Sequence, residues 1–172
     1  MIVPRYTIKG SHIDGAGKGL FIDQPVSAGA ILTAPDRISQ TYSRIELERF
    51  ADDSIELTSS VRWFEDQHTI CPEWTDECYI NHSFTPTAIW HLGFVFAAFD
   101  LEAGTEITMD YRYVLGTGYS AGFRDGATGE MITGLPWEQV FRDSTALLYT
   151  ITQANTRRRT RSRQKGNENR AS

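Results

Sequence analysis

The stretch Tyr79–Pro86 holds the residues best suited to chemistry. It reads YINHSFTP, and the polar pair Asn81 and His82 interrupts an otherwise apolar, strand-forming context. A buried amide or imidazole without a hydrogen-bond partner costs about 1–3 kcal/mol. These side chains must therefore cap the local backbone or face a ligand. An ordinary turn is the alternative interpretation, because Asn, Ser and Pro all favour turns.

Two further segments contain residues that could form part of a ligand-binding site. Residues 15–21 read GAGKGLF, a glycine-rich turn whose backbone can approach a ligand closely or adopt positive φ. This is neither the P-loop pattern nor GxGxxG, so a plain hairpin turn stays open as an alternative. Residues 100–113 read DLEAGTEITMDYRY. They indicate an acidic turn and then a strand that carries Tyr111 and Tyr113 on one face.

Short strands are expected to position these segments. Strands are predicted at 2–8 and 19–22, on either side of the glycine turn. A buried strand pair is predicted at 87–101, broken at Gly93, because both of its faces are apolar. The other expected elements are irregular strand and loop at 55–64 and 68–72, a last strand at 106–113 and a glycine-rich loop at 116–134.

Two helices are also expected. Ser43, with Glu46 three residues later, forms a capping box that opens a short helix. Pro136 opens a second helix that runs to Tyr149. Many short strands with few helices predict a mainly β fold.

Length and composition limit the class of protein. A chain of 172 residues suits one domain with its own core. No apolar run approaches the roughly 18 residues of a membrane span, and the N-terminus lacks signal-peptide character, so an intracellular protein, cytoplasmic or nuclear, is expected. Cys71 and Cys78 are too few for a disulfide framework and too far apart for a zinc half-site. They are interpreted as ordinary thiols, and no metal site is predicted.

Charge is distributed unevenly along the chain. Residues 156–172 hold seven basic side chains and one acidic, a balance of +6, whereas the first 155 residues balance at −11. An acidic body attracts a basic substrate or partner, within the limits of screening by salt. The basic tail has almost no apolar residue and is expected to be disordered. It either balances charge or contacts nucleic acid.

Together, the three segments resemble the SET-domain family of protein lysine methyltransferases. The resemblance rests on GAGKGLF at 15–21, NHSFTP at 81–86 and AGTEITMDY at 103–111, in the order and spacing of that family. It covers about residues 3–113. It implies a mainly β fold, the SET-domain β-clip, in which the Asn-His-Ser segment and the last strand cross in a pseudoknot. A short inserted helix and a C-terminal helix complete this fold.

The resemblance divides the chain into three parts. These are a SET domain at 1–115, a C-terminal loop and helix packed on it at 116–150, and a basic, disordered tail at 151–172. The cysteine-rich zinc segment that closes the lysine channel in many members is missing, which implies a small stand-alone protein. Residues 114–150 would then close the channel. Three aromatic residues of this part are candidates to stack on adenine: Tyr119, Phe123 and Trp137.

The family's activity implies roles for individual residues. The protein would be a protein-lysine N-methyltransferase that uses S-adenosylmethionine, with the cofactor and the substrate lysine on opposite faces and a narrow channel between them. Tyr111 would be the catalytic tyrosine, and Met109 and Tyr113 would line the substrate channel. The cofactor would be bound by two groups of residues, one from the glycine turn (Gly17, Lys18, Gly19 and Leu20) and one from the polar pair (Asn81 and His82).

Three positions near the motifs have their own interpretations. Thr87 stands where many members have Asn, and it is expected to weaken the bonding of the local loop. Met109 replaces an aromatic residue that tunes how many methyl groups are added, so the number of methyl groups stays open. Asp110 is interpreted as a structural hydrogen-bond acceptor.

The expected substrate is a protein with an accessible lysine in a basic segment, because the body is acidic. The alternative is a catalytically silent SET-like module. It would bind a basic peptide in the same groove, or contact nucleic acid through residues 156–172. A non-protein acceptor also stays open.

Overall fold

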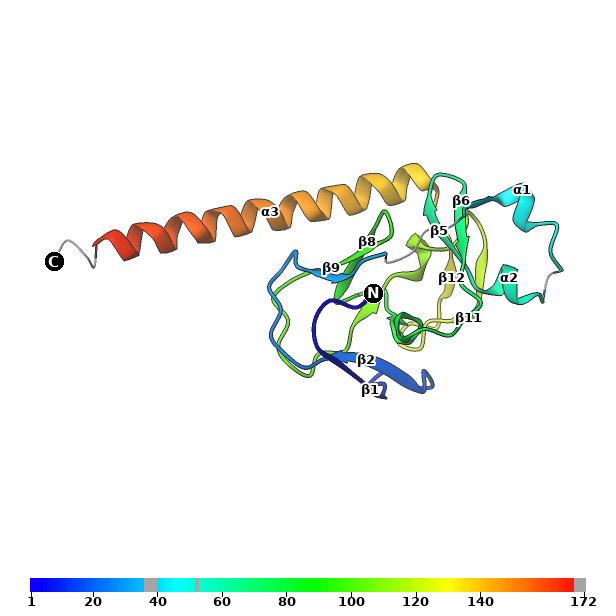
Figure 1. Cartoon of the computed structure of the whole chain (residues 1–172), viewed down its shortest axis with the longest axis horizontal. Helices are drawn as coiled ribbons and strands as arrows, with labels where there is room; N and C mark the ends of the chain where they lie inside the picture. The colour runs from blue at the N-terminus through cyan, green and yellow to red at the C-terminus, as the bar shows by residue number, and fades with distance from the viewer. Residues whose placement is uncertain (36–39, 52, 169–172) are drawn as a thin grey trace.

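The computed structural model describes residues 1–35, 40–51 and 53–168, with side chains as far as Arg157. Small sheets form most of the body, and one long helix lies across it and projects beyond it (Figure 1). This arrangement confirms the mainly β class and the helix at the C-terminal end.

Two antiparallel sheets carry the glycine turn and the core hairpin. β1 (Tyr6–Gly10) pairs with β2 (Lys18–Ile22), so the glycine turn closes a hairpin as expected. A three-stranded sheet has the order β3 (Ile31–Thr33), β9 (Phe94–Ala97) and β8 (Ala88–His91).

The turn between β8 and β9 lies where the sequence places it. Leu92 and Gly93 both have positive φ, at 50° and 82°. A Cβ at Gly93 would lie 2.7 Å from the Trp63 ring, so only glycine fits there. The predicted strand pair broken at Gly93 is confirmed.

An inserted unit follows β3. β4 (Tyr42–Ser43), β6 (Gln67–Ile70) and β5 (Ser60–Phe64) form a sheet in that order. α1 (Arg44–Leu47) opens with the predicted capping box. α2 (Ile55–Thr58) replaces the first part of the irregular strand and loop expected at 55–64, and β5 forms the rest of it. The serine before α2 accepts a hydrogen bond from the Leu57 N–H, which explains why this stretch turns into a helix.

Two segments that are distant in sequence cross at the centre of the body. The 3-10 helix η1 (Asp76–Tyr79) leads into β7 (Asn81–His82), which pairs in parallel with β10 (Thr108–Met109). This is the crossing that the pseudoknot requires. The predicted strand at 106–113 is wrong beyond Met109, because the Asp110 side chain accepts from the Arg112 N–H and starts the 3-10 helix η2 (Tyr111–Tyr113).

The last third of the chain is more regular than expected. The predicted loop at 116–134 contains a hairpin of β11 (Ser120–Arg124) and β12 (Met131–Thr133). α3 (Trp137–Glu168) begins where predicted but does not end at Tyr149.

The longer α3 corrects the expected disorder of residues 151–172. Of these residues, all as far as Glu168 are helical, and 169–172 lie outside the described residues. Contacts beyond Tyr149 help to explain the difference. The Asn155 side chain donates to the Ala28 carbonyl at 2.8 Å, and the Ile151 side chain lies against Gly29.

Buried aliphatic residues anchor each site segment to one core. Leu20 fixes the glycine hairpin, Ile80 precedes β7 and Ile107 precedes β10, and each is at most 2% exposed. Fully burying such a side chain is worth about 1.5–3 kcal/mol. The core therefore holds the three segments in place independently of any ligand.

Candidate active site

The Asn81 side chain joins the three segments. Its Nδ2 donates to the Lys18 carbonyl at 2.9 Å, to Glu106 Oε1 at 3.0 Å and to Ser11 Oγ at 3.2 Å. The amide hydrogens are therefore committed within the protein, and the carbonyl oxygen is the part of this side chain that can serve a ligand. The structure thus brings the glycine turn, the polar pair and the closing segment together.

Glu106 is a site residue that the sequence analysis missed. Its carboxylate is buried and accepts from Ser11 Oγ at 2.6 Å and from the His12 N–H at 2.7 Å, in addition to Asn81. Charged acceptors form stronger hydrogen bonds than neutral ones. The signal in the sequence was a lone acid at the start of an expected strand, directly before Ile107.

Gly19 is required by this close packing. A Cβ there would collide with the Glu106 carboxylate and lie 3.2 Å from Asn81 Nδ2. Gly17 has a different need, because its φ of 75° favours glycine. These two glycines of the turn therefore have a physical reason, and the Lys18 side chain between them is exposed.

His82 links the polar pair to the last third of the chain. Its Nδ1 accepts from the Tyr111 N–H at 3.1 Å, so a neutral ring carries its proton on Nε2. Nε2 is buried and finds no hydrogen-bond partner among the described residues, with Asp125 Oδ1 3.7 Å away. Burial lowers the pKa of His82 and outweighs the two nearby aspartates, Asp110 and Asp125.

Tyr111 lies with its hydroxyl in a fixed position. The hydroxyl donates to the Ile80 carbonyl at 2.8 Å, one residue before Asn81. Burial raises the pKa of Tyr111 to about 12, so the hydroxyl stays neutral at physiological pH. Because its proton is given to Ile80, the hydroxyl can serve a ligand only as an acceptor.

Thr87 strengthens the crossing, and the expectation of weakened loop bonding is wrong. Its hydroxyl donates to the Glu106 carbonyl at 2.9 Å and accepts from the Thr108 N–H at 2.8 Å. The Thr87 N–H in turn donates to Thr108 Oγ1 at 3.0 Å. Thr87 therefore bonds both residues of the crossing segment, Glu106 and Thr108.

Comparison with known protein families decides the affiliation. The model of the SET domain matches residues 17–112, more than half of the chain. The chain belongs to the SET-domain family. Members of this family are generally methyltransferases, and this SET domain carries Lys18, Asn81 and Tyr111 inside the matched range. A comparison with curated proteins found no significant match.

The two expected channel residues are placed differently in the SET domain. The Met109 carbonyl accepts from the Ser83 N–H at 3.0 Å, and its side chain packs against the core. Tyr113 lies in η2 and lines a cleft of about 190 Å³. The other residues that line this cleft include Trp90, Asp110, Arg112 and Leu147. The cleft that Tyr113 lines therefore lies on the side of the body where α3 packs.

Asp110 has the structural role expected of it. Besides capping η2, it accepts from the Arg112 guanidinium through both carboxylate oxygens, at 3.0 Å to Nε. The Arg112 guanidinium in turn lies 4.5 Å from the centre of the Phe84 ring. This chain of contacts ties η2 to the Asn-His-Ser segment.

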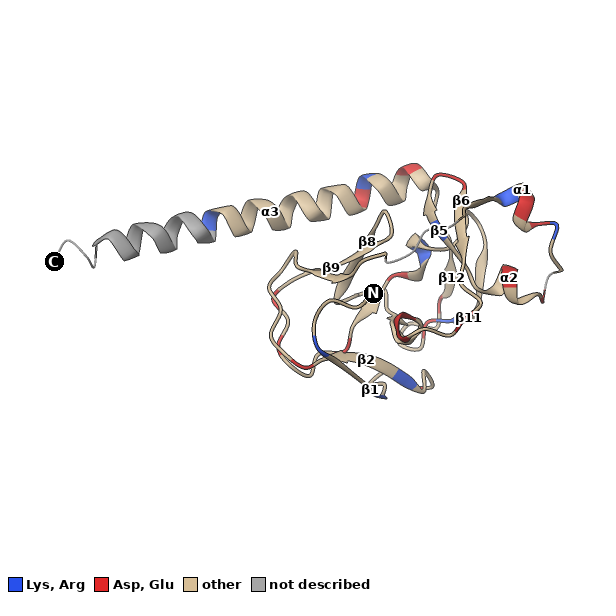
Figure 2. Ribbon diagram, viewed as in Figure 1, with Lys and Arg blue, Asp and Glu red and all other residues tan. Residues whose placement is uncertain are grey.

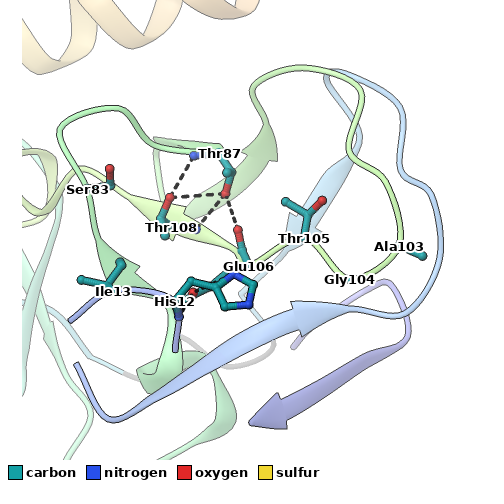
Figure 3. Close-up of a pocket in the computed structure, with 9 residues that line it drawn as sticks. All are labelled: His12, Ile13, Ser83, Thr87, Ala103, Gly104, Thr105, Glu106 and Thr108. Atoms are coloured by element: carbon teal, nitrogen blue, oxygen red, sulfur yellow. Dashed lines mark hydrogen bonds and ion pairs between the residues drawn. The ribbon is translucent and has the colours of Figure 1, made fainter. Parts of the chain in front are cut away.

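A larger pocket of about 470 Å³ lies beside the crossing strands (Figure 3). Figure 3 shows the Thr87–Thr108 pair among the lining residues and the Glu106 main chain bonded to Thr87. The lining residues are His12, Ile13, Ser83, Thr87, Ala103, Gly104, Thr105, Glu106 and Thr108. Of the residues that join the three segments, Glu106 lines this pocket, whereas Asn81 and Tyr111 do not.

One of the three aromatic candidates lies at the site. The Phe123 ring meets the Tyr111 ring edge-on at 6.2 Å and is half exposed. The Tyr119 ring is covered by the Arg44 guanidinium at 3.2 Å, and Trp137 packs on Phe141. The hairpin of β11 and β12 thus supplies the aromatic contact to Tyr111.

Asp125 is the second residue that the sequence analysis missed. It is 5% exposed, lies just after β11 and accepts from the N–H groups of Ala127 and Thr128. It also faces His82 across the gap to the Asn-His-Ser segment. An aspartate in a glycine-rich stretch is typical of a turn. Its position beside His82 depends on the fold and has no local signal in the sequence.

Among the residues that the structure describes, neither a metal site nor a membrane-spanning helix is found. Within 1–35, 40–51 and 53–168, no group of three His, Cys, Asp or Glu residues is arranged to hold a metal ion. Among the same residues, no helix combines the length and apolar character needed to cross a bilayer. Cys71 and Cys78 are free thiols, as interpreted.

Proposed function

We propose that this SET domain is a methyltransferase that uses S-adenosylmethionine and acts on a lysine side chain of a protein. The observation that supports this best is the position of the Tyr111 hydroxyl. It is fixed on the Ile80 carbonyl, directly beside the point where Asn81 bonds the glycine turn. Aligning two reactants is worth about 7–11 kcal/mol when both are held rigidly.

The residues at this point fit the cofactor's polar groups. Lys18 is an exposed cation on the glycine turn, suited to a carboxylate, and Asn81 keeps a carbonyl acceptor. The packed Gly19 leaves no side chain in the way of a ligand at the turn. When bound, S-adenosylmethionine supplies a methyl group on a positively charged sulfur. Gly17, Lys18, Gly19, Leu20, Asn81 and His82 remain the proposed cofactor residues.

Tyr111 serves the amine in this proposal. A lysine amine has an ordinary pKa of about 10.4, and it must be neutral to react. Entry into a water-poor channel lowers the pKa of an amine. The neutral Tyr111 hydroxyl and nearby backbone carbonyls then accept hydrogen bonds that orient its lone pair. Weak C–H···O contacts to the same oxygens would favour a polarised methyl group.

The test compares two tyrosine variants. Purified protein is incubated with cell lysate and isotopically labelled cofactor, and labelled lysines are identified by mass spectrometry. Tyr111→Phe removes the hydroxyl on Ile80, and we expect at least about a hundredfold loss of transfer, as for removal of one positioned donor or acceptor. Tyr119→Phe, whose ring lies on Arg44, is the control and keeps activity.

Calorimetry completes this experiment. Tyr111→Phe should leave cofactor affinity within a factor of a few, because its hydroxyl serves the amine. The enzyme proposal fails if the wild-type protein binds no cofactor, or if Tyr111→Phe transfers methyl groups at the wild-type rate.

A second candidate is a silent module that binds a basic peptide. The commitment of the Asn81 amide hydrogens to Ser11, Lys18 and Glu106 favours it, since the side chain is already satisfied without a ligand. Peptide binding that is strong without cofactor, together with no transfer, would support this module. Salt-dependent binding of nucleic acid, lost when residues 156–172 are removed, would support the other form of this alternative.

A further inference from the structure

Trp74 is an aromatic side chain that the candidate site does not use. Among the large hydrophobic side chains that the structure describes, it is the most exposed, at 73%. Its ring meets the Tyr79 ring edge-on, with 5.8 Å between the ring centres, and Tyr79 packs against the core. Tyr79 therefore holds Trp74 at the surface with most of the indole open to solvent. An open indole face is the best aromatic platform for a cation.

A free carboxylate lies next to this ring in the chain. Glu73 directly precedes Trp74, and its exposed side chain makes no hydrogen bond or ion pair with any described residue. The next two acids are already engaged. Asp76 accepts from the Tyr6 hydroxyl, and Glu77 pairs with the ammonium of the N-terminus at 2.6 Å. Of these three acids, Glu73 is therefore the one left to receive a new cation.

Acidic groups act on this stretch and are common on the body. Burial raises the pKa of the Cys71 thiol, and the charges of Glu73 and Glu77 raise it further. Figure 2 shows further acidic positions at α1, α2 and the start of α3. The first 155 residues together balance at −11. A basic segment is therefore attracted to the body as a whole, whereas a particular contact is needed to fix its register.

The aromatic pair is connected to the candidate active site through the backbone. Tyr79 directly precedes Ile80, whose carbonyl accepts from the Tyr111 hydroxyl at 2.8 Å. Asp76 is bonded to Tyr6, the first residue of β1, whereas the glycine turn follows the other end of that strand, about 13 Å away. The pair is therefore anchored beside the residue that fixes Tyr111, and away from the glycine turn where the cofactor residues are proposed.

We infer that Trp74 and Glu73 form a subsite for an arginine or lysine side chain of the protein substrate, close in sequence to the lysine that is methylated. The inference rests on the proposed function. The cation of the substrate lies on the indole face, and Glu73 balances its charge. Arginine suits this subsite better than lysine, because its planar guanidinium stacks on a ring and is more weakly hydrated than an ammonium. The subsite selects among lysines and leaves the chemistry to Tyr111.

The first test measures binding without cofactor. The probes are short peptides with one lysine among glycine and serine, and with one arginine within about four residues of it on either side, a reach of about 13 Å. The reference peptides carry citrulline, the neutral isostere of arginine, at the same position. The indole N–H signals of the four tryptophans are followed by NMR in the full-length protein, and Trp74→Leu identifies the signal of Trp74.

We expect arginine at one or two positions to shift the Trp74 signal, and citrulline at those positions to leave it in place. Glu73→Gln should weaken the shift. An indole signal of Trp74 that moves equally with both kinds of peptide, or with neither at every position, overturns the inference.

The second test measures methyl transfer to the same peptides. Wild type should show about a fivefold higher kcat/KM for the arginine peptide than for its citrulline partner, the size of one exposed cation–π contact. Trp74→Leu should remove this ratio through KM while it keeps the wild-type rate on the citrulline peptide. Two exposed positions elsewhere provide the controls: Tyr149→Leu on α3 and Glu102→Gln should keep the ratio.

The outcomes separate this inference from the proposed function. If peptides or lysate proteins are methylated with no preference for arginine at any tested position, the subsite is wrong and the enzyme proposal stands. An equal loss on both kinds of peptide in Trp74→Leu would show a purely structural role and would also overturn the subsite. If the wild-type protein binds no cofactor and labels no protein, the proposed function falls, and the substrate subsite falls with it.

Discussion

At the scale of residues, the Glu106 carboxylate holds the site together. It accepts hydrogen bonds from the glycine hairpin through Ser11 and His12, and from the polar pair through Asn81. A buried carboxylate is tolerated only when donors surround it. The geometry of the glycine turn therefore depends on a residue that lies 94 positions from His12 in the sequence.

Gly19→Ala tests this packing. The new methyl group would meet the Glu106 carboxylate and Asn81, and overpacking of this kind costs about 1–3 kcal/mol. We expect that loss in urea unfolding and at least a tenfold loss of cofactor affinity by calorimetry. Gly10→Ala is the control, because a Cβ there has open space among the described residues. Equal effects of the two variants would refute the role given to Gly19.

Thr87→Val tests the hydroxyl that bonds the crossing. Valine keeps the shape but cannot accept from the Thr108 N–H or donate to the Glu106 carbonyl. Leaving these buried groups unpaired should cost about 1–3 kcal/mol in chemical denaturation. Thr85→Val, at an exposed position two residues earlier, should change stability by less than about 0.5 kcal/mol. A Thr87→Val protein as stable as wild type would contradict the assignment.

At the scale of elements, the hairpin of β11 and β12 is the part that completes the site. It brings Phe123 to Tyr111 and Asp125 to His82. The Asp125 carboxylate also closes the hairpin turn through the N–H groups of Ala127 and Thr128. One buried side chain thus couples the fold of the hairpin to the position of the polar pair.

Asp125→Ala should loosen this hairpin. It leaves two backbone N–H groups and His82 Nε2 without the carboxylate, at about 1–3 kcal/mol. Hydrogen exchange should rise across residues 120–133 more than in β8 and β9. Glu130→Ala, on the exposed side of the same hairpin, should leave exchange unchanged. An equal rise in all strands would show a global effect instead.

Local signals made several elements predictable from the sequence. The capping box of Ser43 and Glu46 and the break at Gly93 depend on residues within a few positions of one another. These features need no knowledge of distant contacts. The resemblance to the SET-domain family, and no local signal, implied that the segments of Lys18, Asn81 and Tyr111 come together, and in the structure Asn81 bonds the Lys18 carbonyl and Tyr111 bonds the Ile80 carbonyl.

Other elements depended on contacts that no local pattern reveals. The end of β10 follows from one Asp110 side chain that caps its own neighbour, although the segment has strand periodicity. Glu106 and Asp125 gain their roles from partners far away in the sequence. The length of α3 was underestimated because the polar residue Asn155 binds the Ala28 carbonyl of the body.

At the scale of the whole molecule, two buried histidines and one half-buried histidine set the response to acid. His68, His82 and His91 are held by different elements, and burial lowers the pKa of each below its ordinary value of about 6.5. The unfolded chain therefore binds more protons than the folded one as pH falls below that value. The stability from these neutral rings is present above about pH 6.5 and is lost as pH falls through the folded pKa values.

Thermal unfolding should therefore occur at a lower temperature at about pH 5 than at about pH 7.5. His91→Gln removes the imidazole that contacts Ser144 Oγ at 2.8 Å, and it should flatten this dependence. His12→Gln, at an exposed side chain, is the matched histidine substitution for comparison. A melting temperature that rises toward acid would contradict the role of the buried rings.

The parallel pairing of β7 with β10 has a consequence for folding during synthesis of the chain. The Asn81 strand can pair only after Thr108 has been made, and His82 meets Asp125 later still. A nascent chain that has emerged from the ribosome as far as β9 holds two of the three motifs but cannot form the pairing of β7 with β10. The candidate site therefore assembles only when nearly three quarters of the chain is free to fold.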